Sequence, residues 1–372
     1  MKKNTKIILI VLYLLVLMIF VSCGRQKTQW KGTIEEVNGV TVVKNPKEPM
    51  HGENVLSLEE ELSVGEAEGR EEYMFSGLRG IAVDDRGYIY ALDLKARHVK
   101  VYNEKGEYVR IIGKGGQGPG EFQMPFFILI SPSKELIVTG MAKISYFELD
   151  GEFMKSQNLS TQNIAGLKFD KFGNPFGICI LFEEDNPRIE LRKFNLEFET
   201  KFAIDSSPIS RTRSTGFNPF NPVLRWDILR GEQIVCAYGG EGYILKIYDL
   251  EGKLIKSIHK AYDPAEVTDR DIEIEMQRHG IDSIEFISAP EYKPPFRWIF
   301  TDEEGRIFVS TWELIPESEG YYYDVFDTYG RYLLTVPINS EWLIFKNMKL
   351  HTIERDDEGY QYIKRYKVTW KY

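Results

Sequence analysis

The chain has 372 residues, a formal net charge of −9 and three cysteines. Nucleic acid and anionic lipid bind clustered Lys and Arg, so an acidic chain is not expected to bind either of them. Cys179 and Cys236 fall in apolar segments typical of strands. We interpret them as buried hydrophobic residues rather than as a disulfide or a metal site.

The N-terminus has the pattern of an export signal. Three lysines precede fifteen apolar residues, 7–21, a run shorter than the roughly 20 residues of a membrane span. The following "FVSC" resembles the bacterial lipobox, which implies a lipoprotein signal peptide over 1–22 and a lipid on Cys23. An uncleaved N-terminal anchor is the alternative. Removal of 1–22 takes away three lysines and no acid, which changes the net charge from −9 to −12.

A repeated unit follows, and its first copy is "GIAVDDRGYIYALDLKARHVKVYNEKGEYVRIIGKGGQGPGEF", residues 80–122. Four alternating segments in it predict a four-stranded meander. Its hairpins are joined by "DDRG" and "NEKG", in which Asp or Asn at the first position and Gly at the fourth favour a type I turn. The same turn pattern recurs at Asp84, Asn103, Asp170, Asp249, Asp302 and Asp327.

The glycine-rich run "GKGGQGPGEF", residues 113–122, has the G-x-G-x-x-G spacing of a dinucleotide-binding loop. That loop needs a helix after it, because the helix N-terminus binds the pyrophosphate. Here Pro125 and a run of aromatic and β-branched residues predict a strand instead. We therefore interpret the run as the link from one repeat to the next.

The starts of the repeats predict the fold. Innermost strands are expected to begin near residues 79, 126, 165, 225, 297 and 342, and the last repeat supplies only three strands. An unassigned strand at 53–65 can complete the last sheet and remove both exposed edges. The sequence thus predicts an all-β, six-bladed β-propeller over 53–372, closed by its N-terminal strand. A tether and N-terminal extension, 23–52, precedes it.

The first repeat also carries a family resemblance. The segment "GIAVDDRGYIYALD…HVKVYNEKGEYVRIIGKGGQGPGEFQMP" resembles the NHL-type repeat, and the chain after Cys23 is similar to six-bladed β-propeller lipoproteins of bacteria. The likeness fades in the second, third and sixth repeats. It implies the fold and a membrane tether, but little about a ligand, since propellers host many unrelated functions.

Topology separates the two faces of the wheel. The tight turns share one face, and the opposite, loop-rich face collects the long links at 206–222, 238–243 and 259–295. Binding residues tend to lie on such loops, so we expect any site there. The insert 259–295, between the fourth and fifth blades, is predicted to hold a short helix from Thr268 to Gly280. It is interpreted either as a lid over the channel mouth or as a simple surface insert.

Alignment of the innermost strands brings three arginines to one level of the channel. Arg79, Arg225 and Arg297 would form a positive pocket able to bind a carboxylate, phosphate or sulfate. Aromatic walls for this pocket are predicted from Phe126, Trp226 and Trp298. The alternative is that each arginine pairs with an acid of a neighbouring blade.

Catalysis has little support in the sequence. The five histidines show no metal-ligand spacing, although Asp93, Asp227 and Glu241 could hold a calcium ion at the channel mouth. We therefore expect a monomeric, cofactor-free binding protein, anchored in the bacterial envelope and facing the periplasm or the exterior. It would recognise a small anionic ligand, a peptide or a partner protein. A metal-dependent, lactonase-like hydrolase or lyase is the alternative.

Overall fold

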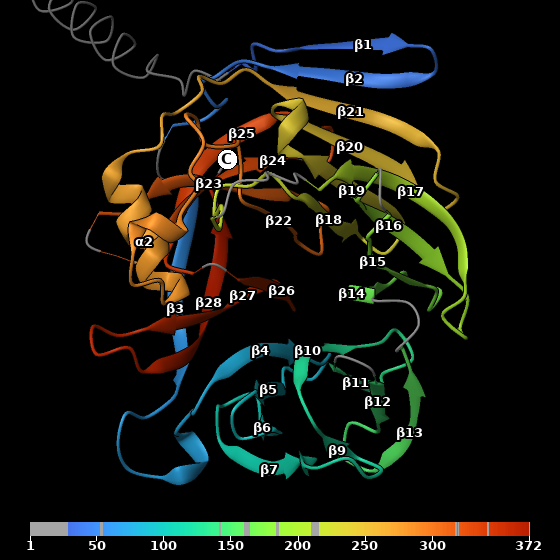
Figure 1. The fold of residues 1–372 in the computed structure, drawn as a ribbon, viewed down its shortest axis with the longest axis vertical. Coiled ribbons are helices and arrows are strands. Elements are labelled where there is room, and N and C mark those ends of the chain that lie inside the picture. The colour runs from blue at the N-terminus through green and yellow to red at the C-terminus, as the bar shows by residue number, and fades with distance from the viewer. Residues whose placement is uncertain are drawn as a thin grey trace, which may run out of the picture.

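A computed structural model describes residues 29–371 except 53–54, 141–142, 160–163, 184–185, 210–215, 317, 319 and 341. The predicted signal peptide 1–22 and Cys23 lie outside the described residues. Six sheets, five with four strands and one with six, surround a common axis (Figure 1), so the predicted six-bladed β-propeller is confirmed. The innermost strands begin within one residue of the predicted positions.

The blades follow one another along the chain, and each runs from its innermost strand outward. Blades 1 to 3 contain β4 (Leu78–Val83), β5 (Ile89–Asp93), β6 (His98–Tyr102) and β7 (Tyr108–Ile112); β10 (Pro125–Ile130), β11 (Leu136–Gly140), β12 (Lys143–Phe147) and β13 (Phe153–Asn158); and β14 (Ile164–Phe169), β15 (Pro175–Leu181), β16 (Arg188–Phe194) and β17 (Thr200–Pro208). Blades 4 to 6 contain β18 (Leu224–Leu229), β19 (Gln233–Tyr238), β20 (Ile244–Asp249) and β21 (Leu254–Lys260); β22 (Trp298–Thr301), β23 (Ile307–Leu314), β24 (Tyr321–Phe326) and β25 (Tyr332–Ile338); and β26 (Leu343–Lys346), β27 (Lys349–Arg355), β28 (Gln361–Trp370) and β3 (Leu56–Val64).

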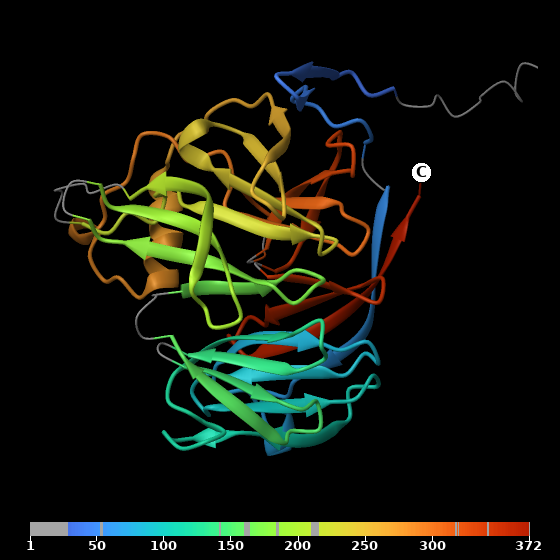
Figure 2. The same cartoon turned by 90° about the vertical axis from the view of Figure 1, so that its right-hand side faces the viewer.

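The ring closes where the N-terminal strand β3 joins the last blade. β3 pairs antiparallel with β28, from Leu56 opposite Trp370 to Val64 opposite Ile363. Figure 2 shows the two strands side by side. Opposite charges cross this seam, because Glu60 pairs with Lys364 at 3.0 Å. The two ends of the ring are thus joined within one blade, in which β3 is the outer strand.

The tight turns have the geometry that their sequence pattern predicts. In blade 1 the Asp84 carboxylate accepts hydrogen bonds from the backbone N–H of Arg86 and of Tyr88, both at 2.9 Å, and Gly87 has a positive φ of 84°. Blade 2 lacks both signature residues, yet Ser131 replaces the aspartate and Lys134 adopts the left-handed conformation at φ 65°. The meander is therefore kept even where the turn sequence differs.

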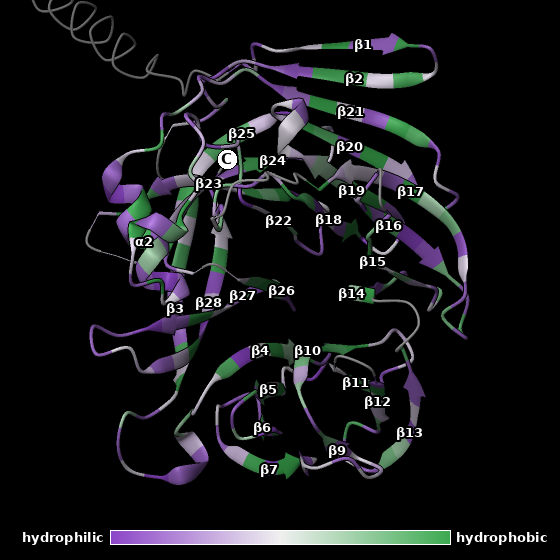
Figure 3. Cartoon of the chain, viewed as in Figure 1, coloured by the Kyte–Doolittle hydropathy of each residue, from purple (hydrophilic) through white to green (hydrophobic). Residues whose placement is uncertain are grey.

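The core lies between neighbouring blades. One cluster joins blades 1 and 2 through Tyr90, Leu92, Leu136 and Phe147, each at most 1% exposed. Equivalent clusters fill the other interfaces, and the hydrophobic colour in Figure 3 gathers on the inner strands. Burial of this apolar surface, at about 25 cal/mol per Å², is the main force holding the blades together.

The N-terminal extension contains a hairpin that the sequence pattern did not lead us to expect. Strands β1 (Thr33–Val37) and β2 (Val40–Asn45) form a hairpin, and β2 lies parallel to β21, so that blade 4 has six strands. Asn45, 5% exposed, fixes the hairpin to the wheel. Its amide donates to the carbonyls of His259 and Gly330 and accepts from Trp30 and from the N–H of Tyr332.

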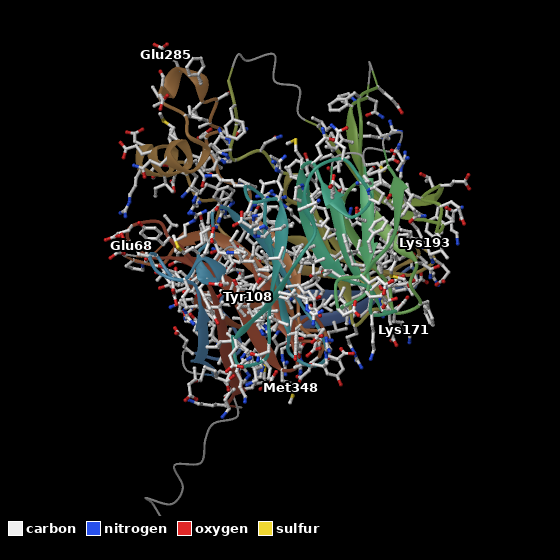
Figure 4. All side chains as sticks on the ribbon, turned by 90° about the horizontal axis from the view of Figure 1, so that it is seen from below. Glu68, Tyr108, Lys171, Lys193, Glu285 and Met348 are labelled. Atoms are coloured by element: carbon white, nitrogen blue, oxygen red, sulfur yellow. The ribbon has the colours of Figure 1, made fainter. Side chains whose placement is uncertain are left out.

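The insert between blades 4 and 5 carries helix α2 (Asp269–His279). Thr268 and Asp271 form a reciprocal capping box at its start, and Gly280 ends it in the left-handed conformation. Three short 3₁₀ helices and one small sheet complete the described structure: Glu71–Tyr73, Gly239–Glu241 and Ile284–Phe286, and the two-stranded sheet of β8 (Lys114–Gly115) and β9 (Glu121–Phe122). Figure 4 shows Glu285, close to α2, on the side opposite to Lys171 and Met348, which lie in tight turns.

Candidate functional site

The most unusual charged side chain of the loop-rich face is Arg225, near the start of the innermost strand of blade 4. Its guanidinium carbon lies 3.6 Å from the ring centroid of Trp298, near the start of the innermost strand of blade 5. No hydrogen bond or ion pair connects Arg225 to another residue within the described ranges. The stacked guanidinium therefore keeps its N–H donors available for a ligand.

The electrostatic surroundings of Arg225 disfavour its charge. Burial, and after it the positive charge of Arg297, lowers the pKa of Arg225 to about 10. Asp227, two residues along the same strand, cannot compensate because its carboxylate already binds Lys168 at 2.5 Å and the backbone N–H of Thr301 at 3.0 Å. Two positively charged guanidinium groups thus lie close to each other and are partly shielded from water. An anion would be attracted strongly to this position.

Arg297 forms the deeper part of the site. It is 8% exposed, and its guanidinium carbon lies 3.7 Å from the ring centroid of Tyr321 and 5.0 Å from that of Trp312. The Tyr321 hydroxyl and the Trp312 indole N–H are both buried and have no hydrogen-bond partner in the described part of the chain. Buried donors of this kind are usually satisfied by a partner or a bound molecule.

The insert packs against this aromatic group. Arg278 of α2 lies over the Tyr321 ring at 4.9 Å and donates to Glu275, a buried carboxylate one turn earlier. His279 meets Phe217 edge to face at 4.8 Å, which ties the helix to the link before blade 4. Arg278, Tyr321 and Trp312 were not among the predicted site residues. Their approach depends on how the insert folds back, and nothing in the local sequence pattern indicates it.

Two of the predicted site residues lie apart from this group. Arg79 is exposed and has no interaction with Arg225 or Arg297 among the described residues. It is the extra residue of a β-bulge, because Leu78 pairs with Asp93 and Gly80 with Leu92. Phe126 is likewise the extra residue between Pro125, opposite Gly140, and Phe127, opposite Thr139. A bulge turns the side chain away from the face that simple alternation predicts.

Trp226 also differs from its predicted role. Its side chain is 8% exposed and packs in the core between blades 3 and 4, with Phe176 and Tyr248 among its cluster. Trp298 instead packs beside Trp342 of blade 6, with ring centroids 5.1 Å apart. The structure therefore brings together Arg225, Arg297 and Trp298 of the predicted set, and places Trp226 in the core.

The acids considered as calcium ligands have other partners. The carboxylate of Asp93 accepts from the backbone N–H groups of Ser76 and Ala96, and Glu241 pairs with Lys246 at 2.7 Å. Among the described residues there is no group of three His, Cys, Asp or Glu side chains arranged to hold a metal ion. Nor does any helix in those ranges have the length and apolar character needed to cross a membrane.

Comparison with known proteins agrees with the fold. Residues 58–217 match a family model described as DUF5128, 6-bladed beta-propeller. A candidate exported protein from Bacteroides fragilis is similar, with a TM-score of 0.56 and 13% identity over 89% of this chain and all of that one. A DUF4221 member from Bacteroides vulgatus has a TM-score of 0.50 and 12% identity over 86% and 99% of the two chains. No curated protein matches at a significant level.

Proposed function

We propose that this propeller is a binding protein whose loop-rich face recognises a small anionic ligand between the starts of β18 and β22. The observation that carries the proposal is the state of Arg225. Its guanidinium is stacked on Trp298 at 3.6 Å and has no ionic partner in the described ranges. The neighbouring charge of Arg297 makes an added negative charge favourable there.

The stacked arrangement suits a carboxylate or a phosphate group. The face of the guanidinium lies on the indole, so its N–H edge remains available for two parallel hydrogen bonds to a planar anion. The buried Tyr321 hydroxyl and Trp312 N–H would offer further donors to a ligand that reaches deeper. A small organic acid and the terminal carboxylate of a peptide share this chemistry.

We further propose that the protein acts in the bacterial envelope, with a lipid on Cys23 after removal of 1–22. The basic and apolar N-terminus followed by "FVSC" supports this proposal, as does a similar fold in a candidate exported protein. Metal-dependent hydrolysis receives no support, because the acids of the channel mouth already bind N–H groups and lysines.

Anion binding to the full-length protein in detergent tests the ligand site. Titration with citrate, phosphate and acetate, followed by tryptophan fluorescence and thermal shift, should show saturable binding, because a ligand of the native state raises its stability. Arg225→Gln should weaken binding at least tenfold, whereas Arg225→Lys should retain part of it. Arg79→Gln removes the same charge from the exposed arginine and is the matched control. Equal affinities for the Arg225→Gln and Arg79→Gln proteins would refute the proposal.

A further inference from the structure

The glycine-rich link between blades 1 and 2 encloses a second place of interest, distant in sequence from Arg225. β8 and β9 pair within the link, and the Glu121 carboxylate accepts from the backbone N–H of Gly118 at 2.9 Å. The same carboxylate forms an ion pair with Lys114 at 3.3 Å. Glu121 thus occupies the position where a phosphate would sit in a glycine-rich loop, and the link itself is not a phosphate site.

A pocket of about 310 Å³ lies between this link and the strands of blade 2. The apolar side chains that line it are Phe122, Met124, Pro125 and Val138. Met124 is 46% exposed. This volume is at the small end of the range of ligand pockets, roughly 300 to 1,000 Å³, and suits a molecule of monosaccharide size.

Three uncharged polar side chains line the pocket and have no side-chain hydrogen bond within the described ranges. Ser145 is only 1% exposed as a residue and lies at the pocket wall. Gln117 and Gln123 belong to the link and are exposed. A ligand in the pocket can form hydrogen bonds with these three side chains. Together the three groups offer both donors and acceptors.

The charged groups of the pocket already make internal contacts. The Lys143 ammonium donates to the carbonyls of Gly118 at 3.2 Å and Glu121 at 3.0 Å. The Glu121 carboxylate binds the Gly118 N–H and Lys114. An uncharged ligand would bind without displacing these internal contacts.

We propose that this pocket binds a neutral sugar residue. Sugar hydroxyls match the free groups of Gln117, Gln123 and Ser145, and the apolar wall accepts the C–H face of the ring. The inference is independent of the anion site, because it rests on different residues of a different blade.

Ligand-observed NMR and calorimetry on the full-length protein test whether the pocket binds a neutral sugar. The probes are glucose, N-acetylglucosamine and glucuronate. A neutral sugar should bind saturably, and glucuronate should bind more weakly than glucose. Gln123→Ala, at an exposed position, should weaken sugar binding roughly three- to tenfold, the effect of one lost hydrogen bond. Ser145→Ala should do the same.

Ser156→Ala is the matched control, since Ser156 lies opposite Ser145 on β13 and is exposed outside the pocket. Arg225→Gln should leave the sugar affinity unchanged, which separates this site from the anion site. Absence of binding by both neutral sugars at high millimolar concentration would overturn the proposal. So would preferred binding of glucuronate, or equal affinities in the Ser145→Ala, Gln123→Ala and Ser156→Ala proteins.

Discussion

Replacement of Asn45 by alanine should release the N-terminal hairpin from the wheel. The Asn45 amide makes two fully buried hydrogen bonds, to the Gly330 carbonyl at 2.9 Å and from the Tyr332 N–H at 2.7 Å, and two partly buried ones. Each buried backbone group left without a partner costs about 1–3 kcal/mol. Because water can enter beside Trp30 and His259, we expect a total loss of about 3 kcal/mol.

Hydrogen exchange measured by mass spectrometry reports the stability of the hairpin separately from the rest of the protein. The peptide that covers Val40–Asn45 should lose protection by about a hundredfold in the Asn45→Ala protein, since 1.4 kcal/mol corresponds to a factor of ten. Strands β4 and β5 on the opposite side of the ring should keep their protection. A urea titration of the same proteins reports whether the hairpin also contributes to global stability.

Lys44→Ala is the control, because Lys44 lies on the same strand and makes only an exposed ion pair with Glu35. It should change protection by less than about 0.5 kcal/mol. If the Val40–Asn45 peptide exchanges equally fast in the wild-type and Asn45→Ala proteins, the four hydrogen bonds do not hold the hairpin, and the reasoning is wrong.

Three further changes test other parts of the molecule. Burial lowers the pKa of His351 from 6.5 to about 4, so its stabilising effect is complete above pH 6.5 and is lost as the pH falls toward 4. The loss approaches about 3 kcal/mol, and His351→Phe should reduce the acid sensitivity of urea unfolding; an unchanged pH profile would contradict this. Thr268→Ala removes the capping box and should speed hydrogen exchange in α2 by the equivalent of about 1 kcal/mol, with β22 as the unaffected reference. Glu60→Gln should lower the free energy of unfolding by up to about 1 kcal/mol in low salt and by less in high salt, unless the seam pair contributes nothing.

The strands were predictable because their turns carry a local chemical signature. An Asp or Asn followed by Gly three residues later fixes many of the hairpins, and alternation then places the strands. The N-terminal hairpin was missed although Asn38-Gly39, with positive φ at both residues, is itself a strong turn signal. Its attachment depends on Asn45 bonding to Gly330, a partner 285 residues away, which no local pattern reveals.

The candidate site was only partly predictable, because it depends on register. The bulges at Arg79 and Phe126 insert one residue each, so counting back from the turn gives the wrong face. Blade 4 also turns through Arg230-Gly231 rather than through an Asp-x-x-Gly turn. Arg225 therefore stacks on Trp298, although the alignment paired it with Arg297.

The seam between β3 and β28 sets an order of assembly. β3 is synthesised before its partner, which ends at Trp370, so the ring stays open until that strand has been made. During that interval Glu59, Glu60 and Glu61 give the waiting strand three negative charges. Repulsion between these charges disfavours the pairing of β3 with β3 of a second copy of the chain. Once β28 has been made, its basic side chains form ion pairs with β3.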